Sequence, residues 1–150
     1  ITGQAPRGYR SPSWELSEHS LGLLASHGFL YDSSLMGDDA PYTLDIGGSG
    51  AKLVELPIHW LLDDAPYFVY APVANRLGPM RNPDEVYAAW SAEFGGLYHY
   101  GRSFNLTMHP QYIGRPGRLL MLERLIAHIR HYPNVEFMRC LDVAEMWTNR

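Results

Sequence analysis

The sequence has 150 residues, of which 46% are hydrophobic and 19% are charged, and its formal net charge is −4. This length and composition are typical of one globular domain and exclude a disordered tail. Because the sequence has no basic cluster, nucleic acid and anionic membrane surfaces are not expected as partners.

Three further features bear on class and location. Every apolar run falls well short of the roughly 20 residues that a membrane helix needs. Cys140 is the single cysteine, so an internal disulfide is not possible. The first ten residues lack the apolar region of an export signal, and we therefore expect a cytoplasmic protein.

In the first half of the sequence, the pattern predicts one helix and two strands. Ser17 is typical of a helix N-cap and Gly28 of a helix stop, which predicts a helix between them. Many glycines and prolines predict a long loop after the first strand. The predicted first strand, loop and second strand are residues 29–31, 33–52 and 53–58.

In the second half, helices and strands are predicted to alternate. Asn82 followed by Pro83 and two acids is a strong helix start. The predicted helices are residues 83–97, 118–131 and 142–148, and the predicted strands are residues 103–108 and 135–137. This alternation with short links indicates βα units, an α/β fold class and a mostly parallel sheet.

The strongest candidate for chemistry is His109, in the segment Leu-Thr-Met-His-Pro at residues 106–110. It directly follows a predicted strand, and active sites of parallel α/β folds form at the carboxyl ends of strands. Histidine titrates near neutral pH, which suits general acid or base catalysis. The alternative is a histidine that only hydrogen-bonds a loop, and the spacing leaves both interpretations open.

Two other segments carry candidate residues. Arg10 lies beside a rigid X-Pro step, where its guanidinium could clamp a carboxylate, or it could be an ordinary surface arginine near a buried Trp14. Residues 55–64 place carboxylates and an aromatic ring just past a predicted strand. Paired acids can tune a histidine or bind a metal, although acids at a loop tip are more often only solvated.

Histidine spacing does not favour a metal site. The seven histidines include no pair four residues apart, so the helical His-x-x-x-His ligand pair is absent. His128 and His131 are three apart on a predicted helix, but they flank its apolar stripe, so we expect them to be solvated.

Together these segments resemble the NodB-type polysaccharide deacetylase family, in its branch of peptidoglycan-deacetylase-like and allantoinase-like proteins. The resemblance covers nearly the whole of residues 1–150. The third family motif, the segment after it, the fourth motif, the fifth motif and the following turn match residues 8–14, 29–34, 55–68, 106–110 and 114–118. The resemblance implies an α/β chain that forms the C-terminal half of a distorted (β/α) barrel, as one partial deacetylase domain with motifs three to five.

The family reaction is metal-assisted hydrolysis of a carbon–nitrogen bond, typically the amide of an N-acetylated sugar. By resemblance, His109 is the general acid, Arg10 orients the catalytic carboxylate, and Asp64, or else Asp63, orients the imidazole of His109. Such a division of roles is physically sensible, because the amine leaves only when it is protonated. The aromatic side chains implied to contact the substrate are Tyr9, Trp14 and Trp60.

The first and second family motifs are missing. The first is an Asp-Asp pair that supplies the base and a metal ligand, and the second is a His-x-x-x-His that supplies the other ligands. The pairs Asp38-Asp39 and Asp63-Asp64 imitate the first motif but occur in the wrong order, so we reject both as metal ligands. We expect a divalent metal, zinc, in the intact family enzyme and no metal in this chain alone.

The leading hypothesis is therefore a truncated deacetylase, which lacks its N-terminal metal-binding half and is inactive alone. Whether this chain is itself an enzyme stays open. An open half-barrel exposes strand edges and apolar surface, so we expect either the missing half or a homo-oligomer as its partner. Two alternatives remain: a cytoplasmic amidohydrolase acting on small cyclic amides, as allantoinases and imidases do, and a non-catalytic carbohydrate-binding or scaffold fragment.

Overall fold

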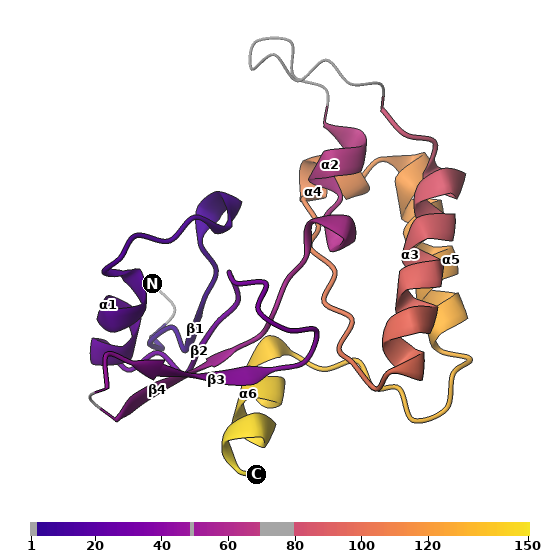
Figure 1. The fold of residues 1–150 in the computed structure, drawn as a ribbon. Helices are drawn as coiled ribbons and strands as arrows, with labels where there is room; N and C mark the ends of the chain where they lie inside the picture. Colours follow the sequence, from indigo (N-terminus) through magenta and orange to yellow (C-terminus); the bar gives the residue numbers. More distant parts are fainter. Residues whose placement is uncertain (1–2, 49, 70–79) are drawn as a thin grey trace. The chain divides into compact units, whose positions relative to one another are not determined.

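The computed structural model describes residues 3–48, 50–69 and 80–150. The chain divides into two compact units, which are coloured along the sequence in Figure 1. The sheet unit comprises Ile1–Ile58 and Phe137–Arg150, and the helical unit comprises His59–Glu136. Each unit has its own buried core, and each is described by itself.

The sheet unit contains a four-stranded sheet in the order β1-β2-β4-β3. Strands β1, β2 and β4 are parallel, as the alternation of helices and strands predicted, and β3 pairs with β4 in the antiparallel direction. The bounds are Gly8–Tyr9 for β1, Tyr31–Asp32 for β2, Tyr42–Ile46 for β3 and Ala51–Glu55 for β4.

Strand β3 and the start of β4 correct the prediction of a loop at residues 33–52. Half-buried Tyr42, Leu44 and Ile46 alternate with exposed neighbours, which is the period of a strand with one covered face. Gly47 and Gly48 follow with φ of 63° and 64°, a backbone region that favours glycine. The glycines therefore mark a turn between two strands, and they hid the strand pattern on either side.

Two helices cover the sheet unit. Helix α1 spans Ser20–Ser26 and α6 spans Cys140–Thr148, close to the predicted helices. Ala144 of α6 is fully buried and clusters with Val54 and Leu56. The predicted strand at residues 135–137 does not form, and Phe137 is 60% exposed. An isolated short segment becomes a strand only where a neighbouring strand is available to pair with it.

The helical unit is built on two long helices that lie side by side in Figure 1. Helix α3 spans Pro83–His99 and α5 spans Pro116–Ile129, which confirms both predicted helices. The unit also contains the short helices α2 at Ala65–Phe68 and α4 at Pro110–Ile113. The core residues shared by these elements are Leu62, Phe68, Val86, Trp90, Phe94, Leu97, Ile113, Met121, Leu125 and Ile129.

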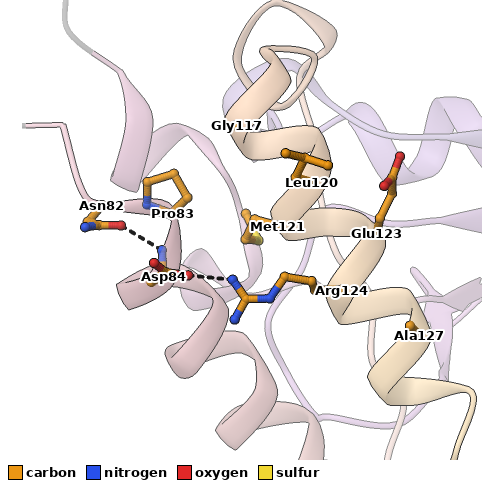
Figure 2. Close-up of a pocket in the computed structure, with 9 residues that line it drawn as sticks. All are labelled: Asn82, Pro83, Asp84, Gly117, Leu120, Met121, Glu123, Arg124 and Ala127. Carbon is orange, nitrogen blue, oxygen red and sulfur yellow. Dashed lines mark hydrogen bonds and ion pairs between the residues drawn. The ribbon is translucent and has the colours of Figure 1, made fainter.

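The start of α3 follows its predicted capping. Asn82 accepts a hydrogen bond from the Asp84 backbone N–H at 2.9 Å, and Asp84 forms an ion pair with Arg124 of α5 at 2.5 Å. Figure 2 shows both contacts at the edge of a groove of about 650 Å³ between the two helices. Residues on two elements thus fix how α3 begins.

The predicted strand at residues 103–108 is replaced by an extended segment with a single bridge. Thr107 pairs with Asp63 in the parallel direction, and its backbone N–H donates to the Leu62 carbonyl at 2.8 Å. Phe104 and Leu106 pack against the core of the helical unit, which explains their alternation. The described residues contain no helix that is both long and apolar enough to cross a membrane.

Candidate active site

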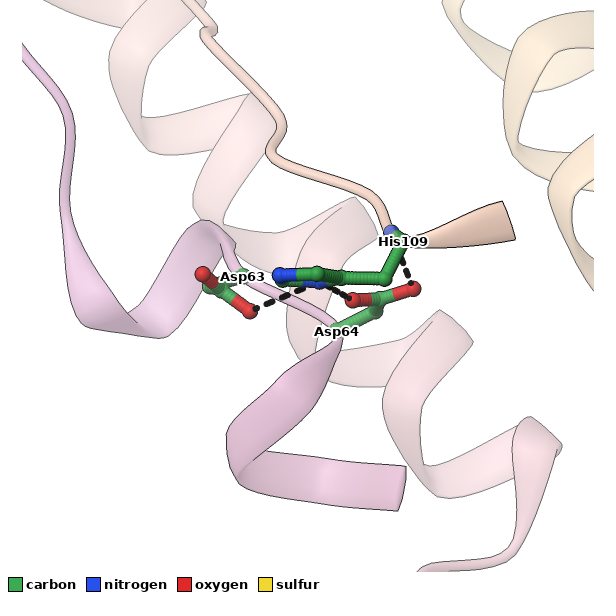
Figure 3. Close-up of side chains that lie close together, drawn as sticks. All are labelled: Asp63, Asp64 and His109. Atoms are coloured by element: carbon green, nitrogen blue, oxygen red, sulfur yellow. Dashed lines mark hydrogen bonds and ion pairs between the residues drawn. The ribbon is translucent and has the colours of Figure 1, made fainter. Parts of the chain in front are cut away.

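His109 and Asp64 lie in direct contact in the helical unit (Figure 3). The His109 Nδ1 atom lies 2.6 Å from Asp64 Oδ1. The His109 backbone N–H donates to the other oxygen, Oδ2, at 2.9 Å. One carboxylate therefore holds both the ring and the backbone of the histidine, which fixes the direction of the imidazole.

The local backbone brings these two residues together across 45 positions of sequence. The Asp64 backbone N–H donates to the Thr107 carbonyl at 3.1 Å, next to the bridge formed by Asp63. His109 has an extended backbone, with φ −110° and ψ 121°, as expected before Pro110. The single bridge between Asp63 and Thr107 thus brings the acid next to the histidine.

Aromatic donors hold the segment that leads into Asp64. A 3-10 helix at Trp60–Leu62 precedes the acid pair, and the Leu61 carbonyl accepts from Trp90 Nε1 at 2.9 Å and from the Tyr67 hydroxyl at 3.1 Å. Trp90 is fully buried in α3. The core of the helical unit is therefore linked directly to the position of Asp64.

The exposure of the pair is asymmetric. The Asp64 side chain is completely buried, whereas that of His109 is 38% exposed. Because Nδ1 faces the carboxylate, the neutral ring carries its proton on Nδ1 and directs Nε2 to other partners. An imidazole oriented in this way by a buried carboxylate can exchange a proton through Nε2.

Asp63 is the second acid of this cluster. Its Oδ1 atom lies 3.8 Å from His109 Nδ1 and accepts a hydrogen bond from the Ala65 backbone N–H at 2.6 Å. Of the two candidates for the orienting acid, Asp64 is thus the one at hydrogen-bond distance from the ring.

The ligand atoms of Asp63, Asp64 and His109 lie within 4.8 Å of one another, so the cluster needs testing as a metal site. The donors do not fit a bound ion. Both oxygens of Asp64 already accept from His109, and a metal at Nδ1 would displace the 2.6 Å hydrogen bond. The described part of the chain therefore presents this cluster as an oriented histidine rather than as a metal centre.

The other predicted site residues are divided between the units. Trp60 is in the helical unit, at the start of the 3-10 helix, and is 46% exposed. Tyr9 ends β1 in the sheet unit, and its ring contacts Phe29 edge to face. Trp14 ends a second 3-10 helix, Pro12–Trp14, and is half-buried. The joint role of these aromatic residues at one substrate stays a prediction.

Arg10 directly follows β1 and reaches across to the turn after β2. Its Nε atom donates to the Ser33 carbonyl at 3.0 Å, and its Nη2 atom donates to Ser33 Oγ at 2.6 Å. The guanidinium is thus held by this turn, and its predicted action on a catalytic carboxylate stays a prediction.

Sequence reasoning overlooked two buried acids in the sheet unit. Asp32 and Glu55 are completely buried, and burial raises the pKa of both carboxyls above their ordinary values. The sequence could have indicated them, because each acid interrupts or ends an apolar strand segment, where burying a charge is costly.

No family model matches the chain. The chain is nevertheless similar to polysaccharide deacetylases in both sequence and fold. It is 32% identical to the peptidoglycan deacetylase of Helicobacter pylori over 100% of this chain and 59% of that protein. A peptidoglycan deacetylase-like protein of Gibberella zeae is 25% identical over 96% of this chain and 52% of that protein.

Solved structures give the same result. A structure described as a polysaccharide deacetylase from Mycobacterium smegmatis superposes with a TM-score of 0.93 at 38% identity, covering 99% of this chain and 51% of that one. An allantoinase superposes with a TM-score of 0.84 at 25% identity and covers 99% of this chain and 48% of that one. These matches confirm the resemblance to the deacetylase family and its α/β barrel type of fold. The chain spans about half the length of the relatives it matches.

Proposed function

We propose that this chain takes part in hydrolysing the amide bond of N-acetylated sugars, with His109 as the general acid and Asp64 as the residue that orients it. The observation that carries the proposal is the double hydrogen bond from His109 to the buried Asp64 carboxylate. The similarity to a peptidoglycan deacetylase over the whole chain supports the substrate class.

The chemistry follows from the needs of the leaving group. An amine departs from a tetrahedral intermediate only after its nitrogen gains a proton, and a positioned histidine can supply it. His109 Nε2 would donate this proton, while Asp64 stabilises the imidazolium ring and holds its direction. Of the other proposed participants, Arg10 would orient the catalytic carboxylate and Tyr9, Trp14 and Trp60 would contact the sugar.

The family implies a divalent metal, for which zinc is our candidate. Bound metal would polarise the scissile carbonyl and bring a water molecule to it. Because the cluster at Asp64 does not fit an ion, we propose that the ligands and the base come from residues outside this chain's 150. The chain would then need a further segment or a partner chain for turnover.

A second candidate is the hydrolysis of small cyclic amides. The specific observation in its favour is the superposition on an allantoinase. The same acid would serve both reactions, because each releases a nitrogen that must be protonated. The two candidates differ in substrate and share the proposed role of His109.

The test measures acetate released from N-acetylated glycan oligomers and ring opening of a cyclic ureide. Both assays use the 150-residue chain and, in parallel, the polypeptide that its complete reading frame encodes. Variant H109Q is compared with H99Q, which changes an exposed histidine at the end of α3. Acetate release that H109Q abolishes and H99Q spares supports the deacetylase. Ring opening alone favours the second candidate, and glycan binding without turnover favours a non-catalytic fragment.

A further inference from the structure

Two buried carboxyls face each other at the carboxyl ends of neighbouring parallel strands. Asp32 is the last residue of β2 and Glu55 is the last residue of β4, and the two are direct partners in the strand register. Both residues are 0% exposed. A side-chain hydrogen bond with the other acid contributes to the shifted pKa of each carboxyl. Two adjacent negative charges shielded from water would strongly destabilise the sheet.

The hydrogen bonds around the pair are divided in a specific way. Glu55 Oε1 accepts from the backbone N–H groups of Ser34 and Leu35, each at 2.9 Å. Asp32 Oδ1 accepts from Ser34 Oγ at 3.0 Å. The remaining oxygens, Asp32 Oδ2 and Glu55 Oε2, are buried without a donor from residues 3–48, 50–69 or 80–150. Each acid therefore has one satisfied oxygen and one that needs a hydrogen.

We propose that Asp32 and Glu55 share one proton between Asp32 Oδ2 and Glu55 Oε2, and that this acid pair is a positioning device for Arg10 and the loop that follows it. A single proton supplies the missing donor to both oxygens and reduces the charge of the pair to one. This is the arrangement by which two adjacent carboxyls avoid simultaneous ionisation.

The titration of the pair agrees with this geometry. Burial raises the pKa of Glu55 from its ordinary 4.5 to about 8 and also raises the pKa of Asp32, so one proton is retained through neutral pH. The charges of both acids, and of Asp38 in the loop before β3, raise the pKa of Tyr42 on β3, and Cys140 of α6 and Arg10 after β1 act on the pKa of Tyr31 on β2. Helix α1, at Ser20–Ser26, contributes no ionisable side chain.

The pair acts on the loop through two serines. Ser34 is held by both acids, and its Oγ accepts from the Ser11 backbone N–H at 2.9 Å. Ser33, between Asp32 and Ser34, receives both hydrogen bonds from Arg10 and donates through Oγ to the Leu56 carbonyl at 2.6 Å. The turn that the acid pair fixes is therefore the turn that holds Arg10.

The loop after Arg10 needs such support. Ser13 and Trp14 have φ of 54° and 59°, in the left-handed region that non-glycine residues rarely adopt. Strained positions of this kind persist only where surrounding contacts impose them, and the Ser11–Ser34 hydrogen bond is one of these contacts. That Arg10 and Trp14 serve a substrate rests on the proposed function, whereas proton sharing does not.

Amide variants test proton sharing because an amide mimics a protonated carboxyl. In E55Q, the amide oxygen can accept from the two backbone N–H groups while its NH₂ donates to Asp32 Oδ2. In D32N, the amide oxygen can accept from Ser34 while its NH₂ donates to Glu55 Oε2. In the double variant D32N/E55Q, both NH₂ groups face each other and neither finds an acceptor. D39N, which changes an exposed acid in the same unit, is the matched control.

Three measurements on the full chain test these variants, and the expected results are as follows. At neutral pH, the infrared spectrum of the wild type and of D39N contains the carbonyl stretch of one protonated carboxylic acid, and each single amide variant lacks it. Each single amide variant unfolds within a few degrees of the wild type, and the double variant loses far more Tm than the two single losses together. The NMR signal of the Arg10 Nε–H remains protected from exchange in both single variants and loses protection in the double variant.

Other outcomes overturn the inference. Additive Tm losses, a single amide variant that fails to fold, or a wild-type spectrum without a protonated acid would each show that no proton is shared. An Arg10 signal that stays protected in a folded double variant would refute the positioning role. Since no readout depends on turnover, an inactive chain would count against the proposed function and leave this inference standing.

Discussion

Asp64 accepts two hydrogen bonds from His109, one from the imidazole Nδ1 and one from the backbone N–H, although 45 residues separate them. The double contact fixes the direction of the ring. It is achieved within the helical unit by one parallel bridge and one X-Pro step. The candidate acid is therefore preorganised by local structure, which lowers the cost of aiming it at a substrate.

The first prediction concerns Asp64. Replacement by Asn removes the charge and presents either an amide NH₂ or an amide oxygen to Nδ1, so the ring loses its fixed tautomer. We expect ¹⁵N NMR to show Nδ1–H as the sole neutral form in the wild type and a mixture in D64N. Turnover of the amide should fall by about 10²–10⁴-fold, the range of a general acid.

A double variant separates orientation from an independent effect of Asp64. If Asp64 acts through His109, D64N has no additional effect on the rate once His109 is Ala, since residues that act as a unit are non-additive. Rate losses that multiply in D64N/H109A would contradict this role.

The second prediction is the pH dependence of stability in the sheet unit. The pKa of Glu55 is raised from 4.5 to about 8, so the folded state binds the proton more tightly than the unfolded state. The contribution of this carboxyl is therefore fully present below pH 4.5 and is lost as the pH rises through about 8. The slope is at most about 1.4 kcal/mol per pH unit for one proton.

Denaturant unfolding between pH 4.5 and about 8 measures whether the free energy of unfolding falls or rises with pH. We expect the free energy of unfolding of the sheet unit to fall as the pH rises in the wild type and to be nearly flat in E55Q. A wild-type stability that increases over the same window would contradict the raised pKa of Glu55.

The third prediction compares two tryptophans of the helical unit that differ in burial. Trp90 is fully buried and donates to the Leu61 carbonyl, whereas Trp60 is 46% exposed. W90A should lower the free energy of unfolding by about 3–5 kcal/mol. W90F, which removes chiefly the hydrogen bond, should cost about 0.5–1.5 kcal/mol.

W60A is the matched comparison. Its stability should stay within about 0.5 kcal/mol of the wild type, as for an ordinary surface substitution. If Trp60 contacts the sugar, W60A raises KM and leaves kcat largely unchanged. An unchanged KM would remove Trp60 from the substrate-binding residues.

The fourth prediction concerns association. Several large apolar side chains are more than half exposed, among them Leu23, Leu120 and Phe137, and such surface favours association. Sedimentation equilibrium at high concentration should therefore detect either self-association or, when the N-terminal half that we propose as a partner is added, a stable complex. A chain that remains monomeric under both conditions contradicts this expectation.

Helices and the candidate acid were predictable from the sequence for identifiable reasons. Asn82 and Pro83 carry a complete helix start, and α3 begins as they indicate. His109 was marked by its position after an apolar alternation and before a proline. The pairing with Asp64 was an expectation of the family resemblance, and spacing alone could not reveal a contact between residues so distant in sequence.

Strands were less predictable because each strand depends on pairing with another segment that can lie far away in the sequence. Residues 103–108 alternate like a strand, yet they form one bridge at Thr107 and otherwise pack their apolar side chains on helices. Tyr42–Ile46 was concealed by the glycines that follow it. The buried contact of Asp32 with Glu55 depends on the register of β2 with β4, which only the fold reveals.

Varying the leaving group of the substrate shows whether His109 protonates it. H109A is assayed on an N-acetylated amine and on an aryl acetate, whose phenolate departs without a proton. The assay uses whichever polypeptide shows turnover in the test under Proposed function. We expect a loss of about 10²–10⁴-fold on the amide and a much smaller loss on the aryl ester. Equal losses on the two substrates would contradict the assignment of His109 as the general acid.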